Sequence, residues 1–156
     1  MKPLGDAGYY AVSVDLPGWG KSKSWDNGPA STEVAKSAVL AILDSLGYDA
    51  AVLMGKSWGG GIAIHSALDR PQRVFRLILT APAFGNLDRL SELRQPILLA
   101  WSEDDPVIPF KIAAVYEKGI PDIQTVYYKT GGHSAAIKNA NDFVPRAVEF
   151  LRNNKS

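Results

Sequence analysis

Three short segments of the sequence carry side chains that together could perform acyl transfer at a serine. This reaction needs a hydroxyl as the nucleophile, a base that takes its proton, and an acid that orients and stabilises the base. Ser57 lies between glycines in the segment Gly-Lys-Ser-Trp-Gly, Asp105 lies in a run of acidic residues, and His133 follows two glycines. These residues are the candidate nucleophile, acid and base.

The surroundings of Ser57 are those of a nucleophile elbow. The apolar run 50–54 precedes the segment, and a helix is expected over residues 58–68. A Gly-x-Ser-x-Gly segment between a strand and a helix makes so sharp a turn that the serine takes a strained backbone conformation. The flanking glycines, Gly55 and Gly59, are then expected where a Cβ atom would clash. The hydroxyl would lie at a helix N-terminus, where negative charge is favoured.

Other titratable side chains near these residues need a separate interpretation. Asp104 and Glu103 precede Asp105, and either could be a solvated loop charge or the true acid. His65, the only other histidine, lies eight residues after the candidate nucleophile. At 1.5 Å per residue this is about 12 Å along the same helix, so we expect His65 to have a structural role.

The order of the expected elements predicts an α/β fold. Strands are expected over residues 9–14, 50–54, 75–80, 96–101 and 123–128, and helices over 32–46, 58–68, 110–118 and 142–153, with a short helix near 88–93. Alternation of strands and helices indicates a mostly parallel sheet flanked by helices on both faces. The three candidate residues each follow a strand, and the carboxyl ends of the strands are where open α/β sheets place their sites.

The composition is that of one ordinary globular domain, residues 1–156, in which 46% of the residues are apolar and 21% are charged. A formal net charge of +1 gives no indication of a nucleic-acid or membrane-surface partner. The absence of cysteine excludes disulfides and thiolate metal sites. No apolar run approaches the length of a membrane span, and the N-terminus lacks the apolar core of a signal peptide, so a cytoplasmic protein is expected. The oligomeric state stays open.

Three segments resemble motifs of the α/β-hydrolase superfamily. Residues 15–22 resemble its Asp-x-Pro-Gly-x-Gly-x-Ser loop, residues 102–109 its Gly-x-x-Asp-x-x-x-Pro loop with a serine in place of the glycine, and residues 131–133 its Gly-x-His turn. The spacing from Pro109 in the second motif selects Asp105 as the acid. The chain order serine, aspartate, histidine is also the one expected of this superfamily.

The resemblance implies a serine hydrolase, of a carboxylesterase-like type, that cleaves an ester, thioester or amide of a small acyl group. Ser57 would attack the carbonyl, His133 would act as general base and then general acid, and Asp105 would hold the imidazolium. The backbone N–H of Trp58 would supply half of the oxyanion hole. The mechanism implies a small-molecule acyl substrate and requires no metal or organic cofactor.

The sequence departs from the superfamily pattern in two ways that affect the expected hydrolase activity. The connection between the strands expected over 75–80 and 96–101 is too short for a lid domain. In this respect the chain resembles the compact, lidless members of the superfamily, including the group called α/β-hydrolase domain-containing protein 14.

The chain also begins at the family's fourth strand. The third strand, which would lie between 9–14 and 50–54, and the loop that carries the second oxyanion N–H are therefore missing, and we expect an N-terminally incomplete chain. The alternative function is that of a non-catalytic binding or interaction protein on a truncated hydrolase scaffold.

Overall fold

Four parallel strands form the sheet of this protein, in the order β1-β2-β3-β4. The computed structural model describes residues 2–23 and 30–153. The strands are β1 (Ala51–Lys56), β2 (Val74–Thr80), β3 (Ile97–Ser102) and β4 (Ile123–Tyr128). They are apolar runs, as expected of strands that are covered on both faces, and every residue of β3 is buried. The predicted α/β fold with a parallel sheet is confirmed.

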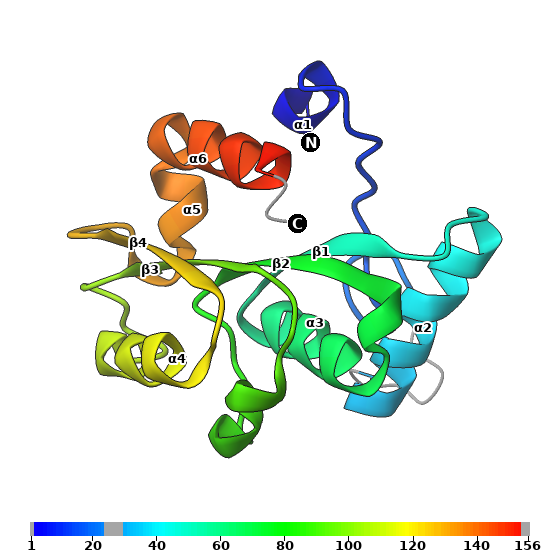
Figure 1. Cartoon of the computed structure of the whole chain (residues 1–156), viewed down its shortest axis with the longest axis horizontal. Helices are drawn as coiled ribbons and strands as arrows, with labels where there is room; N and C mark the ends of the chain where they lie inside the picture. Colours follow the sequence, from blue (N-terminus) through cyan, green and yellow to red (C-terminus); the bar gives the residue numbers. More distant parts are fainter. Residues whose placement is uncertain (1, 24–29, 154–156) are drawn as a thin grey trace.

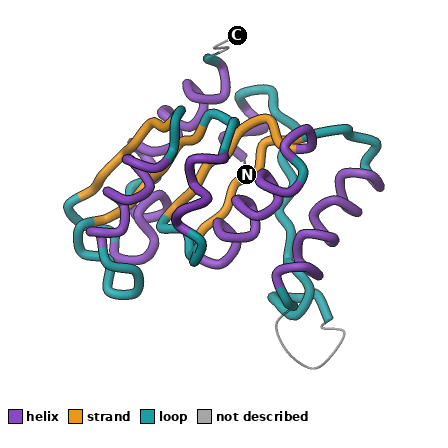
Figure 2. Tube along the Cα trace, turned by 60° about the horizontal axis from the view of Figure 1, so that its bottom comes forward, coloured by secondary structure: helices purple, strands orange, loops and turns teal. Residues whose placement is uncertain are grey.

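Helices cover both faces of this sheet (Figure 1). One face carries α2 (Thr32–Ser45), α3 (Ser57–Asp69), α4 (Ala113–Gly119) and the 3-10 helix η2 (Leu87–Glu92), and the other carries α5 (Ala135–Lys138) and α6 (Ala140–Arg152). The short helix α1 (Lys2–Asp6) lies on this second side, next to α6, and buries none of its residues. Shorter 3-10 turns are η1 (Pro71–Arg73), η3 (Phe110–Ile112) and η4 (Gly132–Ser134). Figure 2 shows the same three layers, with the strands between the helices.

Each face of the sheet has its own apolar core. Successive side chains of a strand point to opposite faces, so Leu77 and Leu79 of β2 join the cluster under α3 and α4, whereas Ile78 joins the cluster under α6. Trp101 is fully buried in the first cluster and Phe150 is almost fully buried in the second. The two cores fix the strand ends, and therefore the loops that follow them.

Residues 9–14 do not form the predicted strand. Among residues 2–23 and 30–153 they have no hydrogen-bonded partner strand, and the side chains of Tyr10, Val12 and Val14 are exposed. Among the described residues, β1 pairs with β2 alone, so it is an edge strand and does not pair directly with residues 9–14. The prediction was wrong because strand propensity reflects packing and pairing with neighbours, and a strand forms only where its backbone groups find a partner.

The remaining expected elements lie close to their predicted positions. Helix α2 begins after Ser31, whose hydroxyl accepts a hydrogen bond from Val34 N–H, and ends before Gly47, which has a φ of 73°. The helix expected over 110–118 is divided into η3 and α4, and α1 was not expected. The connection between β2 and β3 holds only η2. Within the described ranges, no helix has both the length and the apolar character needed to cross a bilayer.

Candidate active site

Ser57 is the first residue of α3 and follows β1 without an intervening loop. Its φ is 51°, in the left-handed region that non-glycine residues rarely adopt, so the expected strained conformation is present. A Cβ atom on Gly55 would lie 2.5 Å from the carbonyl oxygen of Gly59, so the turn requires glycine there. Gly59 itself has open space, with nothing within 4 Å of a Cβ atom. Steric exclusion therefore explains the first of the two flanking glycines only.

The crowded glycines on the helix side are Gly60 and Gly61. A Cβ atom would lie 2.8 Å from Cβ of Pro82 at the first position and 2.0 Å from the carbonyl oxygen of Ala83 at the second. The loop after β2 therefore packs directly against the first turn of α3, and Ala83 N–H donates to the carbonyl oxygen of Ser57 at 2.8 Å. Sequence reasoning missed these two positions, although the run of three glycines was the available signal.

Asp105 and His133 are joined by a hydrogen bond. The distance between Nδ1 of His133 and Oδ2 of Asp105 is 2.9 Å, and the aspartate side chain is fully buried. The other carboxylate oxygen, Oδ1, accepts the backbone N–H groups of Val107 and Ile108 at 2.8 and 3.0 Å. The two residues come from the loops after β3 and β4, as the sequence predicted.

The electrostatics of Asp105 determine the arrangement of protons at the pair. Burial alone would raise the pKa of Asp105, but the hydrogen bonds from His133, Ile108 and Val107 together outweigh it and hold the pKa below its ordinary value. An ionised carboxylate can only accept hydrogen bonds, so Nδ1 of His133 carries the hydrogen. In the neutral imidazole, Nε2 is then the unprotonated nitrogen that can act as a base.

Ser57 follows β1, whereas His133 follows β4, and the two side chains are not hydrogen-bonded in the described part of the chain. Within the described part of the chain, Nε2 of His133 is buried without a hydrogen-bond partner, and no hydrogen bond joins it to the serine hydroxyl. The two loops are linked instead by Lys56, whose Nζ donates to Oγ of Ser134 at 3.2 Å. Catalytic hydrogen bonds are often long without substrate, so this geometry leaves Ser57 as the candidate nucleophile.

The three neighbouring carboxylates have different partners. Asp105 meets the imidazole of His133, whereas Asp104 accepts backbone N–H groups and Glu103 forms an ion pair with Lys129 at 2.8 Å. Asp105 is therefore the carboxylate in position to act as the acid, which is the choice that the spacing from Pro109 favoured.

A pair of stacked tryptophans lies at the elbow. Trp58, which carries the candidate oxyanion N–H, stacks on Trp19 with ring centroids 5.5 Å apart, so the loop that contains residues 15–22 lies beside the candidate nucleophile. His65 packs edge-on against Phe84 at 4.8 Å, and burial lowers its pKa. This contact fits the structural role expected for His65.

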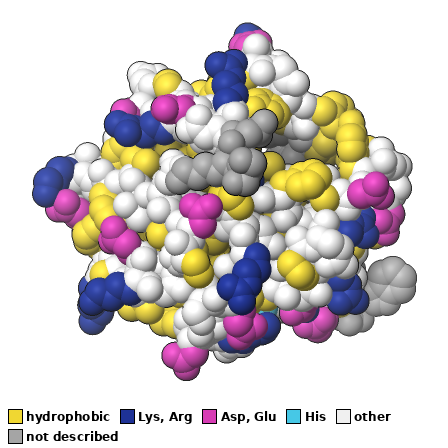
Figure 3. All heavy atoms as spheres, in the orientation of Figure 1, with side chains coloured by type: hydrophobic (Ala, Val, Ile, Leu, Met, Phe, Trp, Pro, Cys, Tyr) yellow, Lys and Arg dark blue, Asp and Glu magenta, His cyan; other side chains and the backbone are white. Residues whose placement is uncertain are grey.

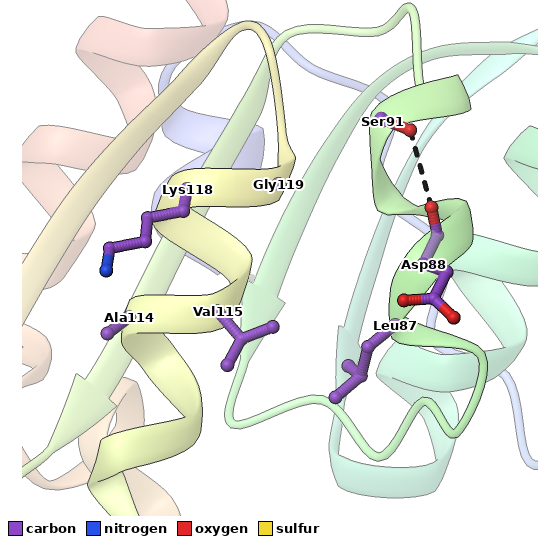
Figure 4. Close-up of a pocket in the computed structure, with 7 residues that line it drawn as sticks. All are labelled: Leu87, Asp88, Ser91, Ala114, Val115, Lys118 and Gly119. Carbon is purple, nitrogen blue, oxygen red and sulfur yellow. Dashed lines mark hydrogen bonds between the residues drawn. The ribbon is translucent and has the colours of Figure 1, made fainter.

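A pocket of about 360 Å³ lies away from these residues, between η2 and α4. Figure 4 shows Leu87 and Val115 facing one another across it, with Ser91 bonded to the backbone oxygen of Asp88. None of the candidate nucleophile, acid and base lines this pocket. The candidate active site is therefore not this pocket but the edge of the sheet at the carboxyl ends of its strands, where Ser57, Asp105 and His133 follow β1, β3 and β4.

The site and the fold agree with the comparisons to known proteins. Residues 1–92 match a family described as alpha/beta hydrolase fold. The chain belongs to the α/β-hydrolase family. It is 39% identical to the 2-hydroxy-6-oxononadienedioate/2-hydroxy-6-oxononatrienedioate hydrolase of Paraburkholderia phymatum, with 94% of this chain and 77% of that protein covered. The family assignment and this relative support a hydrolase.

Two solved structures of hydrolases superimpose on this α/β-hydrolase. One is a CIB-like hydrolase from Thermoplasma acidophilum, with a TM-score of 0.82 and 30% identity over 88% of this chain and 69% of that chain. The other is a meta-cleavage product hydrolase from Pseudomonas fluorescens, with a TM-score of 0.81 and 17% identity over 87% of this chain and 77% of that chain. The second likeness shows the fold alone.

Proposed function

We propose that this α/β-hydrolase is a serine hydrolase with Ser57, His133 and Asp105 as its catalytic triad. The observation that carries the proposal is the 2.9 Å bond between His133 Nδ1 and the fully buried carboxylate of Asp105, at the sheet edge that also holds the strained serine. This bond fixes the tautomer in which Nε2 can take a proton from a hydroxyl.

The proposed reaction is a double displacement. Oγ of Ser57 bonds to the carbonyl carbon while its proton passes to Nε2 of His133, and Asp105 stabilises the imidazolium. Collapse of the tetrahedral intermediate breaks the bond to the leaving group, which takes that proton. Water then attacks the acyl-enzyme by the same sequence, which releases the acid and restores the hydroxyl. Trp58 N–H is the oxyanion donor that we assign.

The proposed substrates are esters, thioesters or amides of a small acyl group, bound in a site without a lid. Two observations support the absence of a lid. The connection between β2 and β3 holds only η2, and the alignment with the Paraburkholderia protein spans 223 residues, more than the 156 of this chain. The relative therefore has residues inside the matched region that have no counterpart here, and we place them at this connection.

The names of the relatives favour a second candidate reaction. A 2-hydroxy-6-oxo-dienedioate has a ketone at carbon 6, and hydrolysis at that ketone breaks a carbon–carbon bond. The same triad could serve, with the carbonyl of the ketone as the electrophile. Nε2 of His133 has no hydrogen-bond partner among the residues that the structure describes, which favours a third candidate, a binding protein that keeps the triad without using it.

The test is active-site labelling with a fluorophosphonate, together with hydrolysis of p-nitrophenyl acetate and of 2-hydroxy-6-oxononadienedioate. We expect Ser57→Ala to abolish both labelling and turnover, and Ser91→Ala, which changes an exposed serine on η2, to leave them unchanged. Equal labelling of wild type and Ser57→Ala would contradict the proposal. A folded wild-type protein that neither reacts nor turns over any substrate would support the binding protein.

A further inference from the structure

We propose that Asp104 is a positioning residue for the loop of residues 129–134, called here the histidine loop. It holds the backbone of this loop so that the ring of His133 contacts Asp105. The inference rests on the proposed function, because it assigns His133 the role of base. Its basis is a pair of hydrogen bonds to one carboxylate. Oδ1 of Asp104 accepts the N–H of Gly132 at 2.8 Å, and Oδ2 accepts the N–H of Gly131 at 3.3 Å.

The histidine loop needs such an anchor because of its two glycines. Gly131 has a φ of 144° and Gly132 a φ of 55°, both in the region that favours glycine. Glycine enters this region easily but also leaves it easily, and it loses more conformational freedom on folding than any other residue. The backbone by itself therefore does not hold the conformation that directs the next residue, His133, toward the acid.

Other contacts hold the flanks of the loop but leave these two N–H groups to Asp104. Nδ2 of Asn139 donates to the carbonyl oxygens of Thr130 and Ala135 at 2.9 and 3.0 Å. The N–H of Ser134 donates to the carbonyl oxygen of Gly131 at 3.1 Å. These bonds use carbonyl groups, whereas Asp104 binds the N–H groups directly before His133. Asp104 is thus the acceptor of both glycine N–H groups, which the other contacts of the loop do not use.

Asp104 and Asp105, consecutive residues of the turn after β3, therefore hold His133 through its backbone and through its ring. The turn after β3 is itself closed by Asp105 N–H, which donates to the carbonyl oxygen of Ser102 at 3.3 Å. From this turn, Asp104 binds the backbone before His133 and Asp105 binds its ring. Removal of the first contact should lower the fraction of molecules in which the second is formed.

The neighbouring ion pair provides a matched control. Glu103 and Lys129 also join the turn after β3 to the end of β4, but their side chains are 41% and 84% exposed. An exposed ion pair contributes little and is screened by salt. Glu103→Gln removes one negative charge from the same turn, as Asp104→Ala does, without touching the glycine N–H groups.

The experiment compares kcat and KM for p-nitrophenyl acetate in Asp104→Ala, Asp104→Asn and Glu103→Gln. We expect Asp104→Ala to lower kcat by about ten- to a hundredfold, the scale that misplacement of a catalytic group by about 1 Å causes, with KM little changed. The side chain of Asp104→Asn has one acceptor oxygen in place of two, so it can bind one of the two N–H groups, and its kcat should lie between those of wild type and Asp104→Ala. The kcat of Glu103→Gln should equal that of wild type. A kcat of Asp104→Ala equal to that of Glu103→Gln would overturn the inference.

A second measurement does not depend on activity. The chain has two histidines, so ¹⁵N-labelled histidine gives two imidazole spin systems, which His65→Gln assigns. We expect the hydrogen-bonded Nδ1 proton of His133 to be observed in wild type and Glu103→Gln and to be lost or broadened in Asp104→Ala. An unchanged signal in Asp104→Ala would overturn the inference even if kcat fell.

This signal also separates failure of the inference from failure of the proposed function. If wild type turns over no substrate, the triad proposal fails, while the imidazole signal still decides the role of Asp104. If Asp104→Ala does not fold, Asp104→Asn is measured in its place. A wild-type kcat together with a wild-type Nδ1 proton signal in Asp104→Asn would then overturn the inference.

Discussion

At the scale of single residues, the ionised state of Asp105 organises the candidate site. Its hydrogen bonds outweigh the effect of burial and keep its pKa low, so it accepts the Nδ1 hydrogen of His133 and leaves Nε2 free for the serine proton. The second feature of the candidate site is the strained φ of Ser57. The first feature depends on hydrogen bonds between two loops, and the second on the crowded glycine at position 55.

The glycines of the elbow give a prediction at this scale. A Cβ atom on Gly55 would meet the backbone of Gly59 and Gly60, whereas one on Gly59 would meet nothing. We expect Gly55→Ala to lower the free energy of unfolding by about 1–3 kcal/mol, as overpacking does. Gly59→Ala lies in α3 and should raise it by about 0.5–1 kcal/mol, through helix propensity. Urea denaturation of both variants measures the difference, and similar losses would show that the elbow is not crowded as described.

At the scale of elements, a partly buried ion pair ties α2 to α3. Lys36 is buried and its ammonium group binds the carboxylate of Asp69, with a second contact to Glu33 at 2.8 Å. The hydrogen bond from Lys36 is the main cause that lowers the pKa of Asp69, and the reciprocal bond raises the pKa of Lys36. Since Ser57 begins α3 and Asp69 ends it, this pair helps to hold the helix that carries the candidate nucleophile.

The sign of the pKa shift of Asp69 gives a prediction of pH dependence. A carboxyl group whose pKa is lower in the folded state stabilises the fold above its unfolded pKa, about 3.9, and loses this effect as the pH falls through the folded value. At pH 7 we expect Asp69→Asn to lower the free energy of unfolding by about 1–2 kcal/mol, less than for a fully buried pair because Asp69 is 35% exposed. The difference from wild type should shrink below a pH of about 4.

The matched control for this pair is Glu33→Gln, which removes the more exposed partner of Lys36. Its effect should stay below about 0.5 kcal/mol, as for other exposed ion pairs. Urea denaturation over a series of pH values measures both variants. Equal losses at pH 7, or a loss in Asp69→Asn that persists unchanged at low pH, would argue against the described pairing.

At the scale of the whole molecule, strand β1 forms one edge of the sheet and leaves backbone groups without a partner strand in the described ranges. The side chain of Met54 in this strand is 57% exposed. Apolar side chains of residues 9–14 are exposed as well. The face in Figure 3 shows acidic and basic side chains interspersed.

An exposed apolar edge strand predicts self-association of this chain. We expect the apparent mass in size-exclusion chromatography with light scattering to rise with protein concentration, and Met54→Lys to suppress this rise, because a charged side chain on an edge strand opposes edge-to-edge pairing. Val115→Lys adds the same charge at an exposed position of α4 and should not suppress it. A concentration-independent mass for wild type, or equal suppression by both variants, would contradict the prediction.

The sequence by itself determined the features that depend on neighbours along the chain. The strand, sharp turn and helix around Ser57 follow from an apolar run, a glycine at position 55 and a helical pattern, because local sterics leave few alternatives. The alternation of strands and helices predicted the parallel sheet, and with it the common edge at which the loops of Asp105 and His133 end.

Only the tertiary structure decided the features that depend on contacts between distant segments. Asp104 and Asp105 have the same chemistry and adjacent positions, and their hydrogen-bond partners differ because the loop after β4 presents glycine N–H groups to one and an imidazole to the other. Residues 9–14 have the composition of a strand, but pairing requires a partner that the described chain does not place beside them. Pairing and hydrogen bonding between segments depend on where the packed cores place them, which local sequence patterns do not specify.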